Sequence, residues 1–450
     1  MSILPQMTII DFMNLDDFGE LNTLKLILEN MPDEKLMQKL EDKRGKGRDD
    51  YPVRAMWNAV IAGVVFRHES VEKLIDELKR NGQLRYVCGF RKYRKIRDKQ
   101  GNITGSEPAV PDSWNLSRFL SNLIGEQGLI DGMFDEALKE VMTLLPDFGE
   151  TLAIDGKAIP SFAKRESEKR DKDGRRDTDA NTGIKKYHGI REDGTAWEKI
   201  TSWFGYKLHL IVDAKYELPV AFSVTKASRS ETAEAKELIK KLKDDNPEIM
   251  DKCEYMIGDR GFDDEEIVRM LWDEHGIKPV IDMRNCLEDK DAVMMFKERH
   301  NIVGYDNYGR IYCYDPVMGD RHMMGFGGFE EDRGTLKYIC ACKSHGMSCR
   351  GRDKCPYYNK TIRIKLDEDR RRFTPVARPS YKWERIYDMR TAIERVNSRV
   401  DNVFGFERHF IRGMKKMQFR CSLALLVMLV LAVGRIRQAK PDLMRKLRTG

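Results

Sequence analysis

The segment from Tyr387 to Arg399 reads Tyr-Asp-Met-Arg-Thr-Ala-Ile-Glu-Arg-Val-Asn-Ser-Arg. It contains neither glycine nor proline, so we expect a helix. Residues three and four apart share a helix face, which places Tyr387, Arg390 and Glu394 in one column. An apolar stripe lies on another side of this helix: Ile386, Ile393, Val396 and Val400. The pattern predicts a core-packed helix that holds a carboxylate between cations, although it is also typical of a solvated face with ion pairs.

Two upstream segments share one design. Thr151–Lys157 and Glu254–Phe262 each contain a short apolar run that leads to an aspartate, Asp155 in the first and Asp259 in the second. Each run predicts a buried strand with the aspartate at its C-terminal end, although a single aspartate there is also typical of a turn. Together with Glu394, these residues offer three hard oxygen ligands, a set that suits Mg²⁺.

From about residue 50 onward, the chain resembles the bacterial insertion-sequence transposases of the DDE type. The last carboxylate of that family lies in the pattern Tyr, two residues, Arg, three residues, Glu, six residues, Lys. Tyr387, Arg390 and Glu394 match this pattern, whereas its lysine position falls on Asp401. The first two carboxylates of the family match Asp155 and Asp259.

The resemblance implies a ribonuclease H-like α/β fold and a DNA transposase. Such an enzyme cleaves transposon ends and joins them to target DNA by phosphoryl transfer that depends on Mg²⁺ or Mn²⁺. Asp155, Asp259 and Glu394 would then be the catalytic, metal-binding residues. Tyr387 and Arg390 would hold a phosphate, with Arg395 or Arg399 replacing the charge missing at position 401. The partners would be double-stranded transposon-end and target DNA, bound by a homodimer.

Two alternatives to this function stay open at the level of sequence. One is a decayed or repurposed transposase that binds DNA without cutting it, against which the complete carboxylate set argues. The other is a metal-dependent nuclease without strand transfer.

Length and composition set broad limits. The 450 residues allow two or three domains, and 80 Lys+Arg against 73 Asp+Glu give a net charge of only +7. Residues 1–12 have no signal-peptide pattern, so we expect a cytoplasmic protein with reduced or metal-bound cysteines. The apolar run Cys421–Val433 is too short for a membrane span and predicts a buried core helix, with no membrane partner.

The first 148 residues predict a helical DNA-binding domain with a basic, aromatic-rich run. Within that run we expect four residues to contact DNA: Arg91, Lys92, Arg94 and Lys95. Lysine and arginine neutralise phosphates, and neighbouring aromatic rings can stack on bases or pack beneath the cations. A solvated loop has the same composition, so this alternative stays open.

The catalytic domain is predicted in two parts, 149–284 and 381–450. Its first part reads as three strands, a helix, a strand, a helix and a strand, the order of a ribonuclease H-like mixed sheet flanked by helices. Residues 164–195 are dense in charge without apolar periodicity, which favours a mobile loop beside the first carboxylate.

An insertion at 285–380 is predicted before the last catalytic helix. It contains four closely spaced cysteines: Cys340, Cys342, Cys349 and Cys355. Thiolates at such spacing could hold a structural Zn²⁺. The spacing is not that of a standard zinc finger, so unligated thiols are the alternative.

Overall fold

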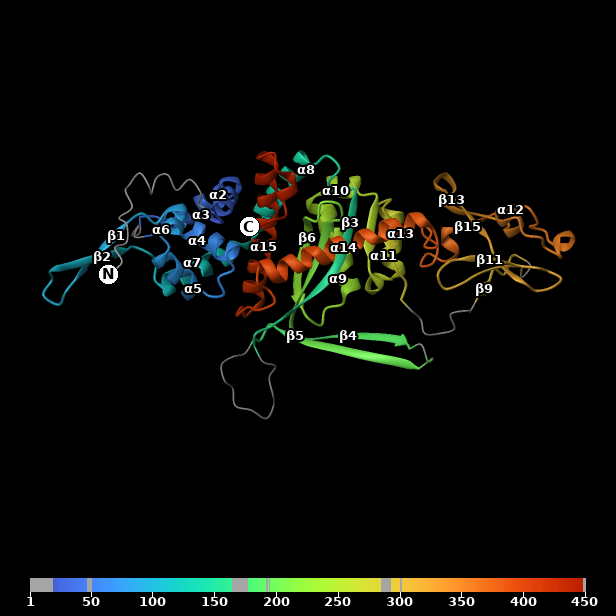
Figure 1. The fold of residues 1–450 in the computed structure, drawn as a ribbon, viewed down its shortest axis with the longest axis horizontal. Coiled ribbons are helices and arrows are strands. Elements are labelled where there is room, and N and C mark those ends of the chain that lie inside the picture. Colours follow the sequence, from blue (N-terminus) through green and yellow to red (C-terminus); the bar gives the residue numbers. More distant parts are fainter. Residues whose placement is uncertain are drawn as a thin grey trace, which may run out of the picture.

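The computed structural model describes residues 19–46, 51–163, 177–191, 193, 195–284, 293–299 and 302–447. Helices of the N-terminal region lie at one end of an elongated molecule, a mixed sheet lies in the middle, and the insertion lies at the other end (Figure 1). The structure therefore has both helices and a mixed sheet, which confirms the predicted α/β class.

The central sheet is built around β3 (Thr151–Pro160). On one side β3 pairs antiparallel with β5 (Ala196–Asp213), which also pairs with β6 (Pro219–Lys226). On the other side β3 pairs parallel with β7 (Tyr255–Gly258), which pairs parallel with β8 (Lys278–Ile281). Leu152, Ala153 and Ile154 are buried, as expected for a central strand.

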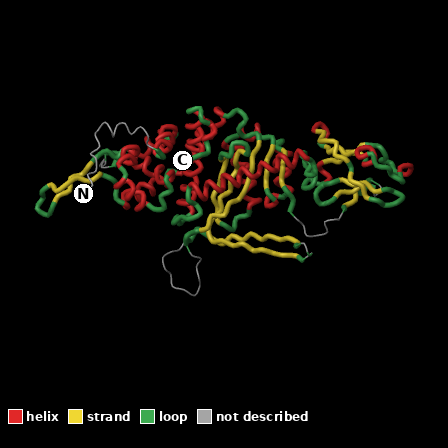
Figure 2. Tube along the Cα trace, viewed as in Figure 1, coloured by secondary structure: helices red, strands yellow, loops and turns green. Residues whose placement is uncertain are grey.

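The polar stretch 164–195 is not a loop throughout. Residues 164–176 lie outside the described residues, but Asn181–Ile190 forms β4, which pairs antiparallel with the first half of β5. The two strands extend from the sheet as a long ribbon, drawn in yellow in Figure 2. The loop prediction was wrong here because most of the first half of β5 is exposed, and an exposed ribbon needs no apolar alternation.

The predicted Tyr387–Arg399 helix is divided. α13 (Tyr381–Tyr387) ends in a 3-10 turn, Asp388–Arg390, and α14 (Thr391–Ser398) then passes into a π turn, Arg399–Val403. One uninterrupted helix was therefore wrong in detail. The apolar stripe is confirmed, since its four residues are all buried: Ile386, Ile393, Val396 and Val400.

Other helices complete the sheet region. α9 (Glu231–Asp245) follows β6, and α10 (Pro247–Lys252) leads into β7. α11 (Glu265–Arg269) and a π turn, Met270–Glu274, connect β7 to β8. From β3 to β8 the structure follows the predicted order except for the added strand β4 and the short α10.

The N-terminal region is helical, with one exposed hairpin of β1 (Tyr93–Arg97) and β2 (Ile103–Pro108). Its helices are α2 (Leu21–Asn30), α3 (Glu34–Arg44), α4 (Val53–Val65), α5 (Val71–Arg80), α6 (Gly82–Cys88), α7 (Ser113–Ile124) and α8 (Gln127–Leu144). These helices share one hydrophobic core with the central sheet.

The long helix α15 (Met414–Arg437) contributes to this shared core. It packs against α2, α4 and α8 as well as β6, and lies between the N-terminal helices and the sheet (Figure 1). By length and composition α15 could cross a membrane, yet 89% of its most apolar window is buried inside the protein. The structure thus accommodates α15 as the core helix that the sequence predicts.

The insertion has a hydrophobic core of its own. Its strands form two small antiparallel sheets. The first contains β9 (Met294–Met295), β10 (Val303–Tyr305), β11 (Ile311–Tyr314) and β12 (Arg321–Met323). The second contains β13 (Gly325–Glu330), β14 (Thr335–Ile339) and β15 (Thr361–Lys365), with the short α12 (Ala341–His345) after β14. The predicted domain boundaries themselves stay a prediction.

Candidate catalytic site

Asp155 and Asp259 lie at the same place on neighbouring strands. The parallel pairing of β3 with β7 ends at Ile154 and Gly258, so the next residue of each strand is one of the two aspartates. Asp259 directly follows its strand, as predicted. Asp155 does not end its strand but lies in the middle of β3, opposite Leu210 of β5. β3 continues because its antiparallel partner β5 is longer than β7.

The two carboxyl groups share an electrostatic environment. Burial raises the pKa of Asp155, and the charge of Asp259 raises it further. Burial also raises the pKa of Asp259, with a further contribution from Glu231, while the Gly261 amide opposes the increase by donating to Oδ1 at 2.7 Å. Charged carboxylates in this position therefore require a compensating cation.

Glu231, the first residue of α9, brings a third carboxylate to the two aspartates. A methyl group at Gly156 would lie 2.9 Å from Glu231 Oε1, and one at Gly261 would lie 3.1 Å from Oε2. Glu231 therefore lies against the residues that follow both aspartates. Sequence reasoning missed it because a glutamate at a helix start is typical of a solvated cap. Gly156 and Gly261, one and two residues after the aspartates, were the available signal.

Two lysines compensate this carboxylate. Glu231 Oε1 lies 3.0 Å from Lys185 Nζ of β4 and 3.3 Å from Lys207 Nζ of β5. Burial alone would raise the pKa of Glu231, but the two ammonium groups lower it overall. Burial alone would lower the pKa of Lys185, yet the charges of Glu231, Asp155 and Asp259 raise it overall. Lys185 thus interacts electrostatically with all three carboxylates.

Helix α14 is fixed to the site through Asn397, whose side chain donates to Asp155 Oδ2 at 2.9 Å. One turn earlier, Glu394 is about half exposed and forms a 2.9 Å ion pair with Arg390. The Arg390 guanidinium lies 5.6 Å from the centre of the Tyr387 ring, so the predicted column of three residues exists. The sequence did not point to Asn397, although it lies three residues after Glu394.

Asp401 and the two arginines predicted to supply the missing charge, Arg395 and Arg399, contact different parts of the chain. Arg395 Nε lies 2.6 Å from Glu217 Oε1, and Arg399 donates to the Glu217 backbone, so both arginines are held by the β5–β6 turn. Asp401 instead accepts a hydrogen bond from Lys157, two residues after Asp155 on β3. Lys157 therefore pairs with Asp401, and the role of Arg395 or Arg399 in supplying positive charge to DNA stays a prediction.

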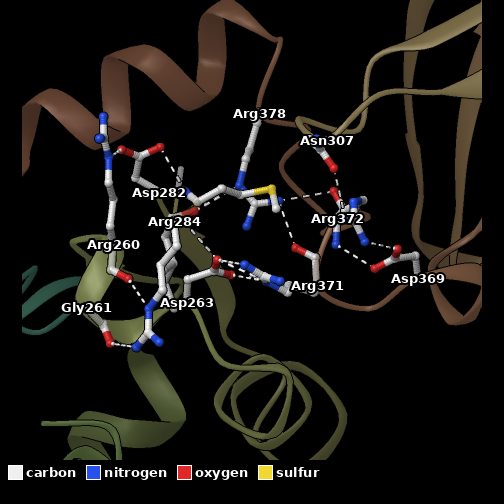
Figure 3. A network of polar contacts seen from close by, with 12 residues as sticks. Arg260, Gly261, Asp263, Asp282, Arg284, Asn307, Asp369, Arg371, Arg372 and Arg378 are labelled. Atoms are coloured by element: carbon white, nitrogen blue, oxygen red, sulfur yellow. Dashed lines mark hydrogen bonds and ion pairs between the residues drawn. The ribbon is translucent and has the colours of Figure 1, made fainter. Parts of the chain in front are cut away.

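The edge around Asp259 is also fixed to the insertion by a polar network (Figure 3). Arg371 Nε donates to both carboxylate oxygens of the fully buried Asp263 at 2.9 Å. Arg284 donates to the carbonyl oxygens of Arg260 and Gly261, and Arg378 donates to that of Ile281. Arg371 and Arg378 of the insertion thus contact the segment that follows Asp259 and the end of β8, respectively.

The oxygen donors fit a hard divalent cation, but they do not form a finished site. Among the described residues, no three His, Cys, Asp or Glu side chains are grouped closely enough to hold a metal ion as they stand. Ion pairs account for the missing metal site, because Glu231 is paired with Lys185 and Lys207, and Glu394 is paired with Arg390. Binding a cation here requires these pairs to rearrange.

The predicted DNA-binding residues at 91–95 lie on or beside the β1–β2 hairpin. All four are exposed: Arg91, Lys92, Arg94 and Lys95. Arg94 forms a 2.5 Å ion pair with Glu107 of β2, and the Arg91 guanidinium lies 4.9 Å from the centre of the Tyr86 ring. The hairpin is therefore an ordered basic element, although nothing in the structure tests its contact with DNA.

The cysteines of the insertion converge more than the sequence suggests. One cavity of about 20 Å³ is lined by the four predicted cysteines and by Cys313, together with Asp315 and His322. Cys349 Sγ donates to Asp315 Oδ2 at 3.3 Å, and the cysteines are free thiols. The structure does not support a zinc site as these side chains stand, and zinc stays a prediction.

The site thus combines a mixed sheet, carboxylates at two adjacent strands and a helix that contacts one of them. A family model described as "Transposase DDE domain" matches residues 147–430, more than half of the chain, and one described as "Transposase domain (DUF772)" matches residues 14–100. The chain therefore belongs to the DDE-domain transposases, a family of nucleic-acid-cleaving enzymes that generally use divalent metal ions. No curated protein and no solved structure matches it.

Proposed function

We propose that this protein is a DNA transposase that cleaves transposon ends and joins them to target DNA. The observation that carries the proposal is the position of Asp155 and Asp259 side by side where the β3–β7 pairing ends, with α14 fixed to Asp155 by Asn397. The strand order β6-β5-β3-β7-β8 supports a ribonuclease H-like catalytic domain.

Asp155, Asp259 and Glu394 are the proposed catalytic set. Their carboxylate oxygens would hold Mg²⁺ or Mn²⁺, which when bound activates the attacking oxygen and stabilises the leaving oxygen of a phosphodiester. The protein itself positions these carboxylates. The strands fix the two aspartates, and Asn397 fixes the helix that carries Glu394. Glu394 is paired with Arg390 in the structure, and if its carboxylate held a metal ion instead, that guanidinium would be free for a phosphate.

DNA contacts are proposed for two regions. Tyr387 and Arg390 lie beside Glu394, where they would hold the phosphate next to the cut. The β1–β2 hairpin would bind duplex DNA through its exposed cations. A homodimer in the DNA complex, a cytoplasmic location and a structural zinc ion at the cysteines of the insertion remain predictions, and metal analysis of protein purified without chelator tests the last.

A supercoiled plasmid carrying transposon ends tests the proposed function. Asp155→Ala, Asp259→Ala and Glu394→Ala should each abolish Mg²⁺-dependent nicking and joining, with end binding kept, because binding depends on basic groups elsewhere. Glu384→Ala and Glu407→Ala are matched controls near the same helix and should remain active.

The products of this assay separate the alternatives. Nicking without joined products in the unmodified protein would indicate a nuclease, and end binding without nicking would indicate a DNA-binding protein. Activity of Glu394→Ala at the rate of the unmodified protein, with loss in either control, would show that the assignment of the third carboxylate is wrong.

A further inference from the structure

Glu231 lies against Gly156 and Gly261, which follow Asp155 and Asp259 by one and two residues. Its Oε2 and Asp259 Oδ1 lie 3.1 Å and 2.8 Å, respectively, from the position that a methyl group on Gly261 would occupy. Its Oε1 lies against Gly156, the residue after Asp155. Any side chain at either glycine would push Glu231 away, so these two glycines permit the close approach of three carboxylates.

Glu231 Oε1 already lies where positive charge is held. It is 3.0 Å from Lys185 Nζ and 3.3 Å from Lys207 Nζ, and these two ammonium groups offset the cost of burying the carboxylate. A divalent ion in place of one ammonium group would meet the same requirement for positive charge.

Lys185 occupies the space that a cation would take. Its ammonium group lies 3.0 Å from Glu231 Oε1 and donates to the Gly156 carbonyl oxygen at 3.4 Å. It comes from the β4–β5 ribbon rather than from the strands that carry the aspartates. Its neighbour in sequence, Lys186, instead pairs with Glu198 across the ribbon and is exposed.

We propose that Glu231 binds the divalent ion together with Asp155 and Asp259, and that Lys185 competes with that ion for the same carboxylates. The proposal rests on the proposed function and adds a fourth carboxylate to the set that the family pattern assigns. Lys207 stays as the second partner of Glu231, held by its hydrogen bond to the Arg229 carbonyl oxygen at 3.0 Å.

Titration of Mn²⁺ into the full chain, followed by calorimetry without DNA, tests the proposal. Glu231→Gln should weaken Mn²⁺ binding about tenfold or more, because a charged ligand is lost. Glu234→Gln is the matched control, one turn further along α9, where the side chain binds Ser223 and Arg229 away from the aspartates. This control should stay within about twofold of the unmodified protein.

A second pair of variants tests the competition in the opposite direction. Lys185→Met should tighten Mn²⁺ binding several-fold, because it removes the internal cation, whereas Lys186→Met should leave the affinity unchanged. If Glu231→Gln shows no cooperative thermal unfolding, the Lys185→Met result alone decides: tighter binding supports the proposal and unchanged binding overturns it.

The outcomes also separate this inference from the proposed function. Equal affinities of Glu231→Gln and the unmodified protein, with weaker binding by Asp155→Asn, would make Glu231 a structural ion-pair partner. Weaker Mn²⁺ binding by Glu231→Gln, without tighter binding by Lys185→Met, would overturn the proposed competition between Lys185 and the ion. Unchanged Mn²⁺ binding by Asp155→Asn would contradict the metal site of the proposed function itself.

Discussion

The sheet edge around Asp155 and Asp259 and the β1–β2 hairpin are both rich in charge, but their charged side chains differ in burial. At the edge, carboxylates are buried next to cations, as with Glu231 between Lys185 and Lys207. On the hairpin the cations are exposed, and the Arg94–Glu107 pair is nearly half exposed on both sides. Buried charges depend on one geometry, whereas exposed charges act through a field that salt screens.

The largest expected effect comes from breaking a buried pair. Asp263→Asn should cost about 3 kcal/mol of unfolding free energy, because the Asp263 side chain is fully buried and holds Arg371 through two oxygens. Urea unfolding measures the change. Glu107→Gln breaks the exposed hairpin pair and should cost at most about 0.5 kcal/mol. Equal costs in the two variants would show that burial does not distinguish the two regions.

Substitutions in the hairpin should change the affinity for DNA rather than the free energy of unfolding. Replacing Arg91, Lys92, Arg94 and Lys95 together by glutamine should weaken DNA binding about tenfold or more and reduce the slope of log K against log salt, because fewer counterions are released. Binding titrations at several salt concentrations measure both quantities. An unchanged affinity and slope would show that these cations form only a solvated surface.

The smallest effect concerns one carboxyl group at the edge. Burial, and then the charge of Asp259, raise the pKa of Asp155. The folded state therefore binds this proton more tightly than the unfolded chain, so stability falls as pH increases from about 4 through the raised pKa. Asp155→Asn removes this loss and should be more stable than the unmodified protein at pH 7, while both proteins converge near pH 4.

Urea unfolding in the presence of a chelator, at pH 4 and pH 7, measures this difference. Lys95→Gln serves as the hairpin control, and its stability should follow that of the unmodified protein at both values. A less stable Asp155→Asn at pH 7 would mean that the charged carboxylate contributes more to the fold than its burial costs.

Sequence patterns predicted those parts of the molecule that depend on apolar periodicity. The buried runs of β3, β7 and β8 and the stripe of α14 follow directly from the positions of their apolar residues. β4 could not be predicted in this way, because an exposed ribbon is stabilised by backbone pairing rather than by an apolar face. The break at Asp388–Arg390 likewise left no mark in a sequence free of glycine and proline.

The site was predictable only as residue types, because its geometry depends on long-range contacts. Asp155 and Asp259 could be selected from their strands, but the partners Asn397, Lys185 and Glu231 come from elements far away in the sequence. The pairing of Lys157 with Asp401 shows the same limit. The family pattern expects a lysine at position 401, whereas here a lysine from strand β3, Lys157, lies beside that position.

Helix α15 has a consequence for how the protein is made. It follows the N-terminal helices and the central sheet in the chain, yet it packs against α2, α4, α8 and β6. During synthesis, the N-terminal helices and the sheet therefore emerge from the ribosome before the helix that joins them. Neither can complete its packing until α15 arrives, so the two regions reach their final packing together and only after α15 has been synthesised.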